Sequence, residues 1–151
     1  PILRDPAVVT EADLVLMEST YGDRLHRDRA DTIRELEGVL DEAWRHKGCV
    51  LIPAFAVGRS QELLYWFAKH WDDWNLSRWR IFLDSPMAAK VVGVYDRHHA
   101  LFDGDAKEVW RNHPSPFRLP NLHITETVDE SMAINRLDGG IIVIAGSGMA
   151  N

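Results

Sequence analysis

The sequence predicts a three-layer α/β/α fold built on a mainly parallel sheet, and two patterns carry this prediction. Short apolar runs of strand length alternate along the chain with stretches that have the periodicity of a helix. Most of these runs are apolar at every position rather than at alternate positions, which is typical of strands that helices cover on both faces. A chain that alternates strands and helices in this way forms parallel strands joined by right-handed crossovers.

Five apolar runs are predicted to be strands. They are residues 14–17, 49–52, 81–83, 122–125 and 141–145. Five other stretches carry apolar residues at helical spacing. They are residues 31–46, 60–71, 88–102, 106–111 and 130–137. Residues 112–120 contain three prolines and are expected to form a loop, because proline donates no backbone hydrogen bond.

Size and composition are those of one globular domain. The 151 residues suffice for one hydrophobic core, and 46% hydrophobic with 26% charged residues argue against disorder. The formal net charge of −6 gives the chain no general attraction for nucleic acid, so phosphate binding requires local basic patches. Cys49 is the single cysteine, which excludes a disulfide framework and a cysteine-based zinc site within the chain.

Neither a membrane span nor a secretion signal is predicted. No apolar run approaches the ~20 residues that cross a bilayer. The N-terminal stretch PILRDPAVV lacks the basic start and the long apolar segment of a signal peptide. We therefore expect a soluble cytoplasmic protein, or a piece of one, without a membrane partner.

Polar and small residues follow four of the five predicted strands. They are residues 18–22 (ESTYG), 53–60 (PAFAVGRS), 84–87 (DSPM) and 146–149 (GSGM). In open α/β sheets, ligands bind outside the carboxyl ends of the strands. We therefore predict a shared polar rim at that edge of the sheet. On this rim Glu18 is either a solvated strand terminus or an acid positioned for chemistry.

Several of the rim residues suit a phosphate. Arg59 and Ser60 open the second helix, whose free N–H groups and partial positive charge favour an anion. The guanidinium of Arg59 can also bind two phosphate oxygens at once. The alternative is that Ser60 caps the helix while Arg59 is simply solvated. Gly146 and Gly148 are flexible enough to bring backbone N–H groups near an anion.

Three further rim residues have structural alternatives. Asp84 is interpreted as a cap or turn residue, with Ser85 beside it as a candidate rim contact. Tyr21 can stack on a base, a contact worth ~1–3 kcal/mol in proteins that bind single strands. The same ring can equally pack beneath its own loop.

Four segments together resemble one family. They are ESTYGDRLH, LIPAFAVGRSQELLY, FLDSPMA and IIVIAGSGM, in that order along the chain. They resemble segments of the β-CASP branch of the metallo-β-lactamase superfamily. The RNA-processing members, RNase J-like enzymes and prokaryotic relatives of the mRNA 3′-end endonuclease, look more similar here than the DNA-repair members. The resemblance implies a Rossmann-like β-CASP fold and the cap domain of a zinc-dependent ribonuclease that hydrolyses RNA phosphodiester bonds.

The resemblance also implies that the metal ligands lie outside this chain. Members of the family hold two zinc ions through His-x-His-x-Asp-His and further residues of a metallo-β-lactamase domain, and single-stranded RNA runs between that domain and the cap. This chain has no such motif, and its seven histidines show no spacing suited to a dinuclear site. We expect residues 1–18 to be a remnant of the metallo-β-lactamase domain and residues 19–151 to be the cap. Such a cap, cut out of a larger enzyme, is expected to be inactive alone.

Residue by residue, the resemblance implies one catalytic group and a set of RNA contacts. Glu18 matches the motif A acid, whose carboxylate holds a histidine supplied from beyond the cap. In the family that histidine protonates the leaving oxygen, and a buried carboxylate would favour its protonated form. The candidate RNA- or phosphate-binding residues are Ser19, Thr20, Tyr21, Gly22, Arg59, Ser60, Ser85, Gly146, Ser147 and Gly148.

Two other functions remain as alternatives. A catalytically inactive relative that only binds RNA or a processing partner would look the same, because the zinc ligands lie elsewhere. Glu18 argues mildly against it, since an inactive copy has no need of the acid. A free-standing nucleotide-binding enzyme would need a Gly-rich phosphate loop after its first strand, and ESTYGD is not one.

The apolar run at residues 14–17 has a structural consequence. In the family this strand belongs to the sheet of the metallo-β-lactamase domain, so here it would be an unpaired apolar edge. We expect residues 1–18 to be displaced, disordered or paired with a second copy of the chain. A homodimer through this strand is therefore a candidate assembly.

Overall fold

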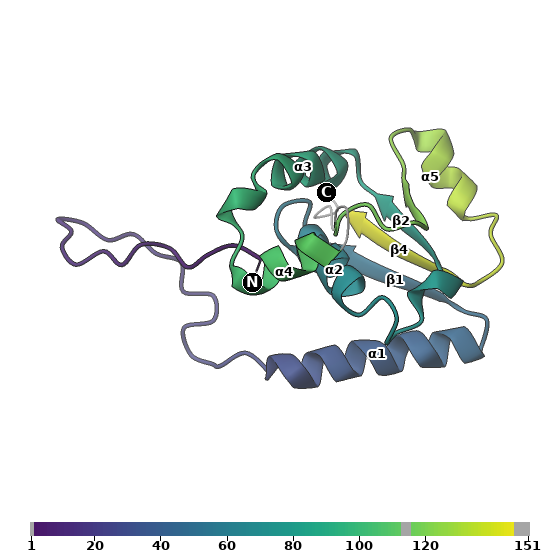
Figure 1. The fold of residues 1–151 in the computed structure, drawn as a ribbon, viewed down its shortest axis with the longest axis horizontal. Helices are drawn as coiled ribbons and strands as arrows, with labels where there is room; N and C mark the ends of the chain where they lie inside the picture. The colour runs from purple at the N-terminus through teal and green to yellow at the C-terminus, as the bar shows by residue number, and fades with distance from the viewer. Residues whose placement is uncertain (1, 113–115, 147–151) are drawn as a thin grey trace.

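Four parallel strands lie at the centre of the structure, a computed structural model that describes residues 2–112 and 116–146 (Figure 1). The strands are β1 (Cys49–Ala54), β2 (Arg80–Asp84), β3 (Leu122–Ile124) and β4 (Ile141–Gly146). Their order in the sheet is β1-β4-β2-β3, and every pairing is parallel. The last strand along the chain therefore lies between the first two. The predicted α/β class with a parallel sheet is confirmed.

Five helices connect or flank these strands within the described residues. They are α1 (Arg29–Arg45), α2 (Arg59–Lys69), α3 (Pro86–Arg97), α4 (Gly104–Asn112) and α5 (Val128–Ile134), with 3₁₀ turns at Leu76–Arg78 and His99–Leu101. Side chains fix several starts: Asp28 caps α1, and Thr127 forms a capping box with Glu130 at α5. All five predicted helices are present. The predicted helix 88–102 is shorter than expected, because α3 ends at Arg97 and a 3₁₀ turn follows.

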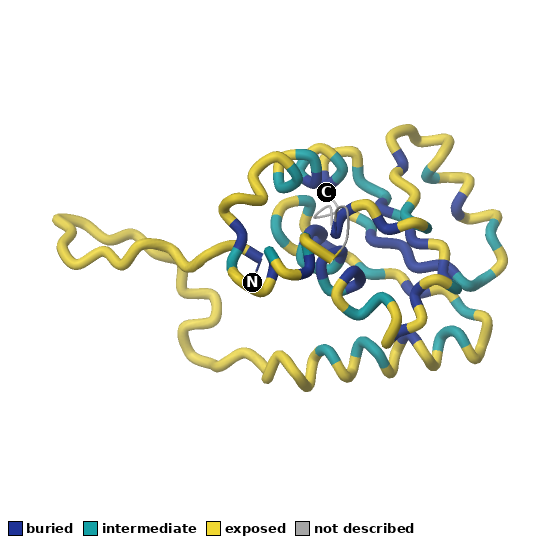
Figure 2. Tube along the Cα trace, viewed as in Figure 1, coloured by how far each residue is buried: buried dark blue, intermediate teal, exposed yellow. Residues whose placement is uncertain are grey.

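The helices make two further layers of unequal size. One face of the sheet packs on α1 to α4 in a core that includes Leu83, Ile142 and Ile144 from the strands. The other face packs on α5 through a smaller cluster that includes Ile141 and Val143. Figure 2 shows the buried residues concentrated on the strands and on the helices that face them. The sheet is thus the middle of three layers, with one thin outer layer.

The first predicted strand is wrong. Residues 14–17 form no strand, and their side chains are exposed, from 68% for Val15 to 87% for Leu16. They lie on the segment that projects from the domain ahead of α1 (Figures 1 and 2). A strand needs a neighbour to take its backbone hydrogen bonds, and the described chain offers none at this place. The sheet therefore has four described strands rather than the five predicted.

The beginning of the described chain is attached to the domain. Ile2 is buried, and Leu3 forms an antiparallel bridge with Phe102. The backbone N–H of Arg4 donates to the Leu101 carbonyl at 3.1 Å, and that of Asp103 donates to the Ile2 carbonyl at 2.9 Å. Of the three expectations for residues 1–18, displacement describes residues 5–18 but not residues 2–4. The homodimer stays a prediction. Among the described residues, no helix is long and apolar enough to cross a membrane.

Candidate functional site

The carboxyl ends of β1, β4 and β2 meet at one edge of the sheet, as the sequence predicts for the rim. Register pairs Ala54 of β1 with Gly146 of β4, and Asp84 of β2 with Ala145 of β4. A Cβ on Gly146 would lie 3.4 Å from the Ser85 hydroxyl oxygen. Two of the predicted contact residues, Ser85 and Gly146, are therefore neighbours across the gap between two strands.

The loop after β1 is held in shape by a buried glutamine. Gly58 has a φ of 86°, and its N–H donates to the Gln61 side-chain oxygen at 2.7 Å. The Gln61 amide donates to the carbonyls of Ala56 at 3.1 Å and Ala88 at 3.4 Å. Because Ala88 belongs to α3, this one fully buried side chain ties the starts of two helices together. The sequence does not predict a link from Gln61 to α3, although a glutamine at the third position of a helix is a capping-box signal.

Ser60 is a structural residue here rather than a surface contact. It is 1% exposed, and its hydroxyl donates to the Phe55 carbonyl at 2.8 Å. Gly58, not Ser60, occupies the N-cap of α2. The predicted contact between the Ser60 side chain and RNA is therefore corrected, because the hydroxyl is both enclosed and committed to the loop. The same hydrogen bond helps to fix where Arg59 starts the helix.

Arg59 lies at the start of α2 on the same edge and is exposed. Its Nη1 is 3.0 Å from a carboxylate oxygen of Glu62, one turn along the helix. An exposed ion pair of this kind is worth ~0–1 kcal/mol, so a phosphate can compete with Glu62 for the guanidinium. Arg59 is thus the accessible cation among the predicted contact residues that the structure describes.

Ser85 and Asp84 have distinct structural roles at the end of β2. The Ser85 hydroxyl oxygen accepts the Ala88 N–H at 3.2 Å and so caps α3. Asp84 accepts hydrogen bonds from the hydroxyls of Thr125 at 2.6 Å and Ser131 at 2.8 Å. One carboxylate therefore joins β2 to the residue after β3 and to α5. This agrees with the interpretation of Asp84 as a structural residue, although the partners come from far along the chain.

Replacing Asp84 by Ala is expected to destabilise the domain by about 2 kcal/mol, because two hydroxyls lose a charged acceptor. Asp84→Asn keeps one acceptor oxygen and should lose less. Chemical denaturation followed by circular dichroism measures both. Asp72→Ala, an exposed carboxylate with no side-chain bond among the described residues, is the matched control and should change stability by less than about 0.5 kcal/mol. Equal effects at Asp84 and Asp72 would contradict the structural role.

Glu18 is not brought to this edge. It is exposed on the projecting segment, and its carboxylate accepts the Thr20 N–H at 2.7 Å. Hydrogen bonds from the Thr20 side chain and backbone hold the pKa of Glu18 below its usual value, so it stays ionised. The geometry of this chain thus presents an ionised acid at the end of an exposed apolar run.

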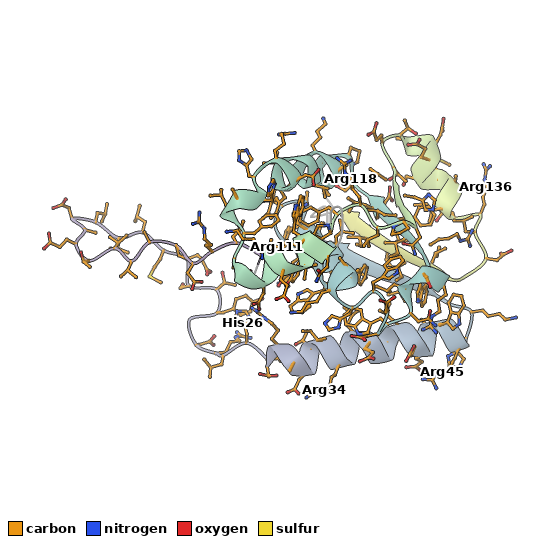
Figure 3. The ribbon with its side chains drawn as sticks, in the orientation of Figure 1. His26, Arg34, Arg45, Arg111, Arg118 and Arg136 are labelled. Carbon is orange, nitrogen blue, oxygen red and sulfur yellow. The ribbon has the colours of Figure 1, made fainter. Side chains whose placement is uncertain are left out.

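The residues after Glu18 form a local turn. The Gly22 N–H donates to the Ser19 carbonyl at 3.0 Å. The Tyr21 ring lies 4.6 Å from the ring of His26, which Figure 3 labels, and the Arg24 guanidinium is 5.9 Å from the Tyr21 centroid. Tyr21 is 54% exposed. Base stacking by Tyr21 stays a prediction, as do contacts from Ser19, Thr20 and Gly22.

Two predicted contact residues, Ser147 and Gly148, lie outside the described residues. Their neighbour Gly146 is the last residue of β4 and is exposed at the rim. Among residues 2–112 and 116–146, no three His, Cys, Asp or Glu side chains lie close enough to hold a metal ion.

The fold is an open α/β domain with glycine, hydroxyl and arginine groups at the carboxyl ends of its strands, the edge where ligands bind in sheets of this class. The family model described as the Beta-Casp domain matches residues 60–151, which is more than half of the chain. The chain therefore belongs to the Beta-Casp domain family, within the metallo-β-lactamase/β-CASP group that the sequence motifs resemble.

Several curated relatives carry names of RNA-processing proteins. The chain is 43% identical over 148 residues to Ribonuclease TTHA0252 of Thermus thermophilus, across 98% of this chain and 34% of the relative. It is 28% identical over 141 residues to Endoribonuclease YSH1 of Yarrowia lipolytica, across 91% of this chain and 16% of the relative. It is 33% identical over 113 residues to Cleavage and polyadenylation specificity factor 73 of Drosophila melanogaster, across 73% of this chain and 16% of the relative. The chain thus spans between 16% and 34% of the length of these relatives.

Proposed function

We propose that this chain is the cap domain of a metal-dependent ribonuclease and contacts the backbone of single-stranded RNA. The observation that carries the proposal is the 43% identity, over almost the whole chain, to a relative named as a ribonuclease. The second support is geometric, because α2 and α3 both start at the edge where Arg59, Ser85 and Gly146 lie. Helix N-termini and an exposed guanidinium are groups that bind phosphate.

The catalytic part of the proposal requires a second domain. We assign residues 1–18 to a metallo-β-lactamase domain, residues 19–151 to the cap, and two zinc ions to ligands outside this chain. The apolar run 14–17, exposed along its whole length and ending in ionised Glu18, supports this division, because such a run needs a covering surface. Glu18 then acts as the motif A acid of the complete enzyme. A cytoplasmic location belongs to the same proposal.

The test is RNA binding without cleavage by the 151-residue chain. Fluorescence anisotropy of a labelled single-stranded RNA should show binding that weakens with salt. Arg59→Gln is expected to weaken binding and to reduce the slope of log affinity against log salt by about 0.7, the value for one lost phosphate contact on a single strand.

Arg97→Gln is the matched control. Arg97 is exposed at the far end of α3, and its substitution removes the same charge as Arg59→Gln. It should leave the affinity close to that of the unchanged chain. RNA cleavage by the pure chain in the presence of a chelator would contradict the proposal that catalysis requires a second, metal-binding domain. Absence of any RNA binding would contradict the proposal that the cap contacts the RNA backbone.

A further inference from the structure

A basic cleft lies at the edge of the sheet opposite the rim. Its volume is about 670 Å³, and it is lined by Trp44, Arg45, Lys47, Arg78, Arg80, Asp138, Gly139 and Gly140. Arg80 is the first residue of β2, and Gly140 directly precedes β4. The cleft therefore lies at the amino ends of the strands. Since a strand rises about 3.3 Å per residue, the six residues of β4 separate it from the rim by about 20 Å.

The lining combines four cations with a single carboxylate, on a chain whose formal net charge is −6. Three of these cations, Arg45, Lys47 and Arg80, form no ion pair within the described residues. A cleft lined by charges of one sign concentrates its field and attracts the opposite charge. The lining is therefore suited to an anion.

The fourth cation is held as part of the wall. The Nη2 of Arg78 is 2.6 Å from a carboxylate oxygen of Asp41, and its guanidinium lies 5.0 Å from the centroid of the Trp44 ring. Trp44 in turn packs edge-on against the buried ring of Trp79. Arg78 is thus engaged by Asp41 and Trp44, and the other three cations are the ones without an ion pair among the described residues.

The preference for cations at the C-terminal end of a helix accounts for only some of the cations in the cleft. Arg45 and Lys47 lie at the C-terminal end of α1, where cations are ordinarily favoured by the helix dipole. Arg80, however, belongs to a strand and donates one hydrogen bond to the Gly139 carbonyl at 3.1 Å, which orients its guanidinium at the cleft. Lys47 has a φ of 52°, a backbone conformation that usually selects glycine. Two separate elements therefore contribute available cations to one concave surface.

We propose that this cleft is a second binding site for the phosphate backbone of single-stranded RNA, remote from the rim. The inference rests on the proposed function, since RNA is the polyanion that the rim already brings to the domain. Arg45, Lys47 and Arg80 contact phosphates there, independently of base sequence. An RNA long enough to pass around the domain is then held at both edges of the sheet.

The experiment measures binding of a single-stranded RNA of about 20 nucleotides, which exceeds the ~4–16 nucleotides that one OB fold, a common single-strand-binding module, covers. The double variant Arg45→Gln/Lys47→Gln is compared with the unchanged chain over a range of salt concentrations. Two lost phosphate contacts should reduce the slope of log affinity against log salt by about 1.4. Arg80→Gln, from a different element, should reduce it by about 0.7.

The matched control is Arg34→Gln/Arg111→Gln, which removes the same charge outside the cleft. Arg34 lies on α1 with Arg45 but several turns away, and Arg111 lies on α4 (Figure 3). Circular dichroism verifies that each variant is folded. Hydrogen exchange of residues 138–140 gives a second measurement, because RNA in the cleft should slow their exchange in the unchanged chain and not in the double variant.

The outcomes test the second site in the cleft separately from the proposed function at the rim. Weaker binding and a smaller slope in the cleft variants, with the control unchanged, support the second site. If Arg59→Gln weakens binding while the cleft variants do not, the second site is overturned and the proposed function stands; the cleft then suits an acidic protein segment instead. Equal losses in the cleft and control variants also overturn it, because net charge alone would account for them. Absence of RNA binding by the unchanged chain overturns both.

Discussion

Replacing Glu18 by Gln in the complete enzyme is expected to lower turnover by roughly 10²-fold or more, which is the range for groups that support general acid catalysis. The proposed function places this carboxylate against the histidine that protonates the leaving group. A neutral amide keeps the shape but no longer stabilises the protonated imidazole. The measurement is the rate of RNA cleavage under saturating substrate, with KM determined separately.

Folding should be untouched by this substitution. Glu18 is exposed, and the hydrogen bonds described for its carboxylate all come from nearby Thr20, so the substitution leaves the packed core unchanged. Glu11→Gln is the matched control, because Glu11 is an exposed carboxylate on the same projecting segment. It should leave turnover unchanged. Full activity of the Glu18 variant would remove the catalytic role and favour the alternative of an RNA-binding relative.

Replacing Gly139 by Ala is expected to destabilise the domain by roughly 3 kcal/mol, through left-handed backbone strain and a direct overlap. Gly139 has a φ of 55°, and a Cβ at this position would collide with the Lys47 carbonyl oxygen. That carbonyl is backbone just ahead of β1 and has little freedom to move. For a domain of this size, 3 kcal/mol corresponds to a drop in Tm of about 6–12 °C, measurable by thermal unfolding.

Gly38→Ala is the control with the opposite expected sign. Gly38 lies within α1, and a Cβ there would meet nothing within 4 Å. Alanine in an exposed helix interior is more stable than glycine by about 0.5–1 kcal/mol, so this variant should raise Tm. A Gly139 variant as stable as the Gly38 variant would contradict the close approach of the loop before β4 to the loop before β1.

Most of the elements follow from local pattern. The predicted strand 141–145 differs from β4 by one residue, and the predicted helices occur near their expected places. Hydrophobic periodicity and prolines determine helices and strands over a few residues. These elements can therefore be predicted from one sequence. The rim could also be predicted from the sequence, because parallel strands bring their carboxyl ends to one edge whatever their order. Arg59, Ser85 and Gly146 accordingly lie where their positions after strands indicate.

Residues 14–17 show the limit of local pattern. An apolar run indicates that a segment is able to form a strand, but a strand exists only where another strand pairs with it. Ser60 shows a second limit, because its place in a helix start suggested exposure and the loop after β1 instead closed over its hydroxyl. Both outcomes depend on groups that are distant in sequence or supplied from elsewhere.

The sequence by itself determined the alternation of strands and helices, the family resemblance and the polar groups at the carboxyl ends of the strands. Only the tertiary structure decided the strand order and the hydrogen bonds of Asp84 with Thr125 and Ser131. It also decided that Arg45, Lys47 and Arg80 line one cleft. The physical reason is that β4, formed last along the chain, enters between β1 and β2. That insertion makes the residues ahead of β4 neighbours of those ahead of both β1 and β2, and no local pattern specifies it.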